Sequence, residues 1–147
     1  MTHTYLFEEG VWQAHGIFLD EHGQQFPLEG QTTISHDDAL WKNVGFMRVL
    51  SEPPMELQNT YEIQPVPSSG ESTTWTSYNP GVGELVGQFV VIHDSILSLY
   101  STPNREFTGM ESLRQIHENA YQNRGVLMKG EQKISSWAVE LVRERFA

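Results

Sequence analysis

The chain has 147 residues, a length typical of a single domain, so we expect residues 1–147 to form one unit around one core. Its 9 Lys and Arg residues are outnumbered by 19 Asp and Glu residues, and a net charge of −10 without any basic cluster excludes nucleic acid as an expected partner. The absence of cysteine excludes disulfides, thiolate metal sites and a cysteine nucleophile.

Short segments in which apolar and polar residues alternate recur along the chain, with turn residues between them roughly every 8 to 12 positions. The segment 55–65 has the clearest alternation, because Leu57, Asn59 and Tyr61 share one side and charged or polar residues occupy the other. Gly, Pro, Asn and Asp between the segments favour turns. The expected strands are, in chain order, residues 10–20, 25–35, 41–51, 55–65, 72–79, 84–93, 95–102, 105–117, 119–129 and 132–144.

The last third of the chain allows two interpretations. Thr108 and Glu111 match a capping box, and residues 108–124 could form a helix ended by Gly125. Residues 134–146 also fit both a helix and a strand. We prefer strands, because an even number of them lets an antiparallel meander close on itself without exposed edges. The sequence thus predicts an all-β fold, an antiparallel up-and-down β-barrel of about ten strands with at most short helical turns.

Residues at the two ends of the strand ladder carry a resemblance to a known group of barrels. Gly10-Val11-Trp12 opens the first long strand, and the last segment ends in Arg143. With the hairpins between them, the chain resembles the calycin superfamily, the small β-barrels that include lipocalins and fatty-acid-binding proteins. The resemblance implies that Trp12 closes one end, with Arg143 or Arg145 resting on the indole face. It also implies a cavity that holds a small, mostly apolar ligand.

Polar and aromatic residues on the expected inward faces are the candidates for ligand contact: Arg48, Tyr61, Trp75, His93, Tyr100 and Tyr121. Arg48 shares a strand face with apolar residues, and a buried guanidinium is costly unless it meets a carboxylate, so it suggests an acidic ligand. The other register places Trp41, Met47 and Val49 inside and leaves Arg48 in water. Tyr61 has the alternative role of a core tyrosine bonded to a neighbouring strand.

His93 is the histidine with the most suggestive position. It continues the apolar face of Leu85 and Phe89, and an inward imidazole at a barrel mouth could bind haem iron, act as a base or orient a polar ligand. The alternative is a histidine at a strand end whose hydrogen bonds go to Asp94 and the turn. Haem is the one cofactor that an inward His93 would suggest, and no other cofactor is expected.

Signatures of enzymes and metal sites are fragmentary. Ser35-His36-Asp37 and His93-Asp94-Ser95 contain triad residue types, but neighbours in a strand or turn face different ways, so turn chemistry is the preferred interpretation. No HExxH motif or H-x-H pair is present, and no metal site is expected. The question of an enzyme stays open, with a non-catalytic protein preferred.

The favoured function is a binding or carrier protein that encloses a small hydrophobic or amphipathic ligand, acidic if Arg48 lies inside. The alternatives are an isomerase, cyclase or lyase using an inward histidine, a haem-binding barrel, and a structural or interaction barrel without a ligand. Residues 1–10 lack the pattern of a signal peptide, and no window approaches about 18 apolar residues, so we expect a cytoplasmic protein with no membrane partner. Monomer and homodimer remain equally open.

Overall fold

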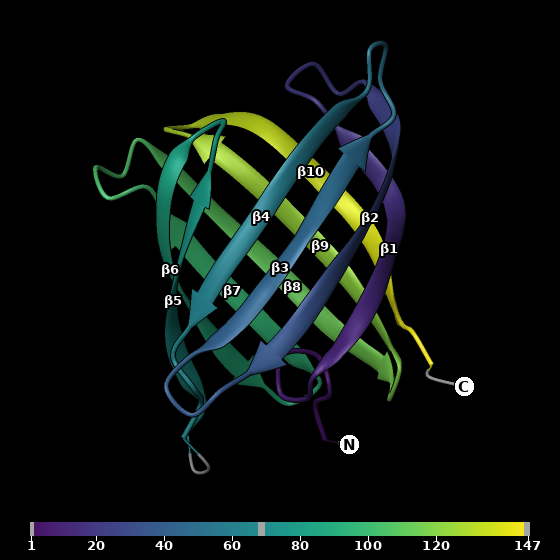
Figure 1. Cartoon of the computed structure of the whole chain (residues 1–147). Coiled ribbons are helices and arrows are strands. Elements are labelled where there is room, and N and C mark those ends of the chain that lie inside the picture. The colour runs from purple at the N-terminus through teal and green to yellow at the C-terminus, as the bar shows by residue number, and fades with distance from the viewer. Residues whose placement is uncertain (1, 68–69, 146–147) are drawn as a thin grey trace.

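The computed structural model of the chain describes residues 2–67 and 70–145, and the ten strands found there form one closed barrel (Figure 1). Each strand pairs antiparallel with the next along the chain, and β10 pairs with β1 to complete the wall. None of the described residues is helical, and hence none belongs to a helix that could cross a membrane. The strands are β1 (Gly10–Leu19), β2 (Gln25–His36), β3 (Trp41–Val49), β4 (Met55–Ile63), β5 (Ser72–Asn79), β6 (Gly83–Ile92), β7 (Ser95–Ser101), β8 (Phe107–His117), β9 (Ala120–Lys129) and β10 (Gln132–Arg143).

The predicted all-β, up-and-down barrel of about ten strands is confirmed, and so is the preference for strands in the last third. Residues 108–124 lie in β8, in β9 and in the turn between them, and the second ambiguous segment lies mainly in β10, with its residue 146 outside the described part. Thr108 and Glu111 cap no helix. Both are paired to β7 and β9, and these long-range ladders override the local capping pattern.

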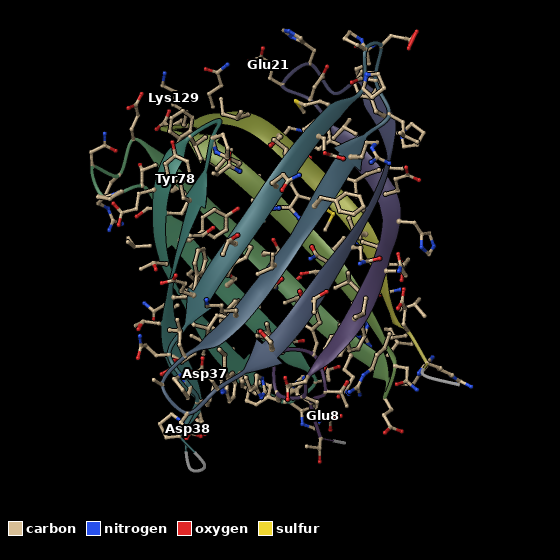
Figure 2. All side chains as sticks on the ribbon, in the orientation of Figure 1. Glu8, Glu21, Asp37, Asp38, Tyr78 and Lys129 are labelled. Atoms are coloured by element: carbon tan, nitrogen blue, oxygen red, sulfur yellow. The ribbon has the colours of Figure 1, made fainter. Side chains whose placement is uncertain are left out.

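The two ends of the barrel differ. The closed end carries the turns after β2, β4, β6 and β8 together with the N-terminal segment, residues 2–9, and the open end carries the turns after β1, β3, β5, β7 and β9. In Figure 2, Glu8, Asp37 and Asp38 mark the closed end, whereas Glu21 and Lys129 mark the open end.

Hydrogen bonds fasten the N-terminal segment across the closed end. The backbone N–H of Thr4 donates to the Tyr121 hydroxyl at 3.1 Å, and the Thr4 hydroxyl donates to the carbonyl of Glu118 at 2.6 Å. On another side of the barrel, the imidazole of His36 bonds the carbonyl of Leu6 at 2.7 Å. Because these partners lie in β9, in the turn before it and at the end of β2, the segment acts as a plug that is tied to the rim at several points.

The plug rests on a buried tryptophan, as the resemblance implied. Trp12 is fully buried, and the guanidinium carbon of Arg143 lies 6.0 Å from the centre of its ring. The same guanidinium donates to the Glu8 carboxylate at 2.8 Å and to the Glu9 carbonyl at 2.7 Å. Arg143, rather than Arg145, is therefore the cation over the indole, and it ties the last strand to the plug.

Candidate ligand-binding cavity

The barrel interior is hollow between the plug and the open end. It encloses a cavity of about 190 Å³, lined by residues that include Tyr61, Trp75, Tyr100, Glu111, Asn123 and Trp137. For comparison, an apolar cavity of about 150 Å³ accepts benzene. The space therefore suits a molecule of one or two rings.

Glycines on the inner wall explain why so many aromatic residues leave space between them. In three places an inward aromatic side chain faces a glycine on the adjacent strand, and a Cβ at that glycine would lie between 2.2 and 2.6 Å from the nearest ring atom. The rings therefore lie along the wall, over the neighbouring backbone, instead of projecting into the centre. The pairs are Trp75 with Gly87, Tyr100 with Gly109, and Trp137 with Gly125.

Glu111 of β8 places a carboxyl group inside this cavity. The side-chain amide of Asn123 donates to it at 2.5 Å. Burial raises the pKa of Glu111, and hydrogen bonds from Asn123 and Trp137 oppose that shift. No Lys, Arg or His is among the residues that line the cavity in the described part of the chain. The interior thus contains an acid without a basic partner.

Two tyrosines, Tyr61 and Tyr100, line the same cavity as this acid. Tyr61 packs edge-to-face on Trp75, with 5.0 Å between the ring centres. Burial, and to a smaller extent the negative charge of Glu111, raises the pKa of both Tyr61 and Tyr100. Their hydroxyl groups stay protonated at neutral pH, so they can donate hydrogen bonds as well as accept them.

The sequence-predicted residues do not all come together in the cavity. Tyr61, Trp75 and Tyr100 line it, and a contact between them and a ligand stays a prediction. Tyr121 is also fully buried, but its hydroxyl group accepts hydrogen bonds from the plug, and its ring packs edge-to-face on Trp12 at 5.6 Å. Tyr121 therefore belongs to the closed end rather than to the cavity wall.

Arg48 lies on the outer face, so the expectation that it points inward is wrong. Its guanidinium donates to the carboxylates of Glu29 at 2.9 Å and Glu56 at 2.8 Å, and these bonds raise its pKa. Glu29 and Glu56 are its partners on the two neighbouring strands, so all three side chains share the outer face. The other register is the observed one, with Met47 and Val49 inside.

His93 does not continue the inner face of β6, and the expectation of an inward imidazole is also wrong. The strand ends at Ile92, and His93 forms the turn to β7 with a φ of 50°. Its side chain is exposed, and its carbonyl bonds the imidazole of His3 at 2.8 Å. Without a histidine among the described lining residues, the interior offers no imidazole ligand for haem iron. The residues present therefore do not fit haem ligation by a histidine.

Glu111 is the functional candidate that the sequence interpretation missed, although a strand was expected over residues 105–117. In that strand Gly109, Glu111 and Leu113 share one face, and the exposed Met110 and Arg114 share the other, so the pattern needed to find Glu111 was present.

The cavity reaches the open end beside β4. There β4 pairs with β5 only over Thr60–Ile63, while its preceding residues, Met55–Asn59, have no partner in β5. Figure 1 shows β4 diverging from β5 and β6 toward this end. Asn59 from β4 and Val82 from the turn after β5 line the cavity on the two sides of the gap. We call this gap the mouth.

Comparisons with known proteins identify the fold. The S-type phycobiliprotein lyase CPES from Guillardia theta superposes with a TM-score of 0.69 at 7% identity, over 97% of this chain and 92% of that one. Rv2717c from M. tuberculosis superposes with a TM-score of 0.69 at 14% identity, over 92% of each chain. The fold is calycin-like. No family model and no curated sequence matches this calycin-like barrel, and identities this low establish the shared fold alone.

Proposed function

We propose that this calycin-like barrel binds a small hydrophobic or amphipathic molecule inside its cavity. The observation that carries the proposal is the set of three glycines facing Trp75, Tyr100 and Trp137, because these pairs keep the rings against the wall and the centre empty. A barrel that served only as a packed structural unit would fill that space with side chains. A ligand would enter at the mouth beside β4, where β4 and β5 are unpaired and Asn59 and Val82 line the cavity.

The chemistry of the wall defines the ligand further. Aromatic and aliphatic side chains favour an apolar body, and the Tyr61 hydroxyl and the Asn123 amide would orient a polar end. An acidic ligand was suggested only by an inward Arg48, and it is no longer favoured, because Arg48 lies outside the barrel and pairs there with two glutamates. The volume favours a molecule of one or two rings, with any longer part extending through the mouth.

Two measurements test this function. Native mass spectrometry of freshly purified protein should show a retained small molecule, or the emptied protein should bind 2-naphthylmethanol in calorimetry.

Ser98→Phe fills the cavity from β7 and should weaken that binding at least tenfold, whereas Leu99→Phe, on the exposed face of the same strand, should leave it unchanged. If Ser98→Phe fails to fold, Asn59→Trp at the mouth serves the same purpose. No retained molecule together with no binding, or equal binding by both variants, would overturn the proposal.

A lyase-type reaction on the bound molecule is a second candidate. One structural neighbour is a phycobiliprotein lyase, and burial raises the pKa of Glu111, the direction that favours a general acid. Incubating a molecule recovered from the cavity with wild-type protein, and with Glu111→Gln, tests this. A change in its mass that depends on Glu111 would support catalysis, and an unchanged mass would leave binding as the activity.

A further inference from the structure

Two hydrogen-bond acceptors, the Glu111 carboxylate and the Asn123 side-chain carbonyl, lie side by side in the cavity, and the second has no donor among the described residues. Asn123 is 5% exposed, and its amide N–H₂ group donates to the Glu111 carboxylate at 2.5 Å. Its own carbonyl oxygen, Oδ1, is buried and has no hydrogen-bond partner among the described residues. Buried polar atoms in folded proteins are nearly always paired, so an unpaired acceptor beside a carboxylate indicates that a donor comes from outside the chain.

The charge of the cavity favours a cation as that donor. An isolated buried carboxylate is costly, and the lining offers no Lys, Arg or His to compensate it. The faces of aromatic rings carry partial negative charge, and Trp75, Tyr61 and Tyr100 line the same space. The net charge of −10 also draws cations toward the protein at low ionic strength.

We propose that Glu111 and Asn123 form a receptor for the protonated amino group of a ligand whose remaining part is apolar or aromatic. The ammonium group has three donors and no acceptor, so it can bond the Glu111 carboxylate and Asn123 Oδ1 together. This inference rests on the proposed binding function and names its ligand class. An inward Arg48 would have implied a negatively charged ligand, whereas this receptor would bind a positively charged one.

Three compounds of one shape test the inference by calorimetry at pH 7 and low salt: 2-naphthylmethylamine, a cation; 2-naphthylmethanol, its neutral analogue; and 2-naphthoate, an anion. Wild-type protein should bind the amine at least tenfold more tightly than the alcohol, and the naphthoate most weakly. Glu111→Gln should bring the amine to within about twofold of the alcohol while the affinity for the alcohol is kept. Asn123→Leu, which removes the second acceptor, should weaken the amine selectively by about fivefold.

A matched variant separates a local contact from the overall charge. Glu62→Gln removes the same charge from the exposed face of β4, and it should keep the full preference for the amine. Loss of the preference in Glu62→Gln as well would overturn the inference, since the effect would then be one of net charge. Equal binding of amine and alcohol by wild-type protein would overturn it and leave the binding function intact. Binding of none of the three compounds would overturn both. If Glu111→Gln fails to fold, Asn123→Leu alone decides between these outcomes.

Discussion

Gly109 of β8 lies directly against the ring of Tyr100 of β7, so closely that a methyl group at Gly109 would stand 2.2 Å from the Cζ atom of the ring. The two residues are opposite each other in the ladder. Because glycine has no side chain, the ring can occupy the space above its backbone and leave the lumen free. The cavity therefore depends on Gly109 having no Cβ, because a Cβ there would collide with the Tyr100 ring.

Gly109→Ala should consequently turn the Tyr100 ring into the lumen. We expect binding of 2-naphthylmethanol to weaken at least tenfold and the free energy of unfolding to fall by about 1–3 kcal/mol from overpacking. Calorimetry and urea denaturation measure the two effects. In a Tyr100→Ala background the same substitution should have little effect, because the three nearest atoms to the added methyl all belong to Tyr100. An equal penalty in both backgrounds would contradict this explanation.

Trp12→Ala should destabilise the barrel by about 3–5 kcal/mol, because it removes a fully buried indole from beneath the plug. Arg143→Gln should cost less, about 0.5–2 kcal/mol, since it removes the cation over the ring and the ion pair with Glu8 but leaves the indole in place. Urea denaturation checks both values. A loss below about 1 kcal/mol for Trp12→Ala would show that the indole is not central to the closed end.

Tyr121→Phe should loosen the plug. The backbone N–H groups of Thr4 and Tyr5 would lose their shared acceptor, and a buried unpaired donor costs about 1–3 kcal/mol. We expect amide hydrogen exchange in residues 2–9 to accelerate, by about tenfold or more if the segment opens locally. Tyr78→Phe, at a tyrosine that is 65% exposed, is the control and should leave this exchange unchanged. Protection that is equal in both variants would argue against the role of the Tyr121 hydroxyl.

Glu111→Gln should stabilise the protein in a manner that depends on pH. Burial raises the pKa of Glu111 in the folded state, so the folded protein holds this proton more tightly than the unfolded chain does. The destabilising effect is absent below the ordinary pKa of 4.5 and grows as the pH rises through the folded-state pKa. The variant should therefore melt at a higher temperature than wild type at pH 8.

Differential scanning calorimetry at pH 4 and pH 8 measures this difference. At pH 4 the two proteins should melt at nearly the same temperature, because Glu111 is mostly protonated in both states of the wild-type chain. Glu62→Gln controls for the loss of one charge and should show no comparable gain at pH 8. A gain of equal size at both pH values would point to packing rather than to ionisation.

The two-residue alternation of the sequence was enough to predict the strands and the class of barrel. It placed Tyr61 on an inward face, because β4 is apolar on one side only, and it placed Trp12 on the same face of β1 as Ala14 and Phe18. The pairing of a basic residue from the last segment with Trp12 also followed from the resemblance, although the choice between Arg143 and Arg145 needed the structure.

For Arg48 and His93, the alternation of apolar and polar residues is not enough to predict where the side chain lies. Both faces of the strand around Arg48 carry apolar residues, so its register depends on Glu29 and Glu56 in the adjacent strands. In the sequence, the apolar alternation of β6 extends to His93. The strand itself ends one residue earlier, because Ile92 already pairs with Ser95 of β7 and His93 lies in the turn between them. In each case, the deciding contacts come from residues of another strand.

Period and turn chemistry are local properties, so the sequence by itself determined that the chain forms about ten short strands joined as a meander. Which side chains share the lumen is set by pairing between strands and by closure of β10 on β1, and only the tertiary structure could decide it. Pairing of β8 with β9 brought Glu111 beside Asn123, and pairing of β7 with β8 placed Gly109 against Tyr100. Those two contacts, one electrostatic and one steric, distinguish a hollow acidic site from a packed core.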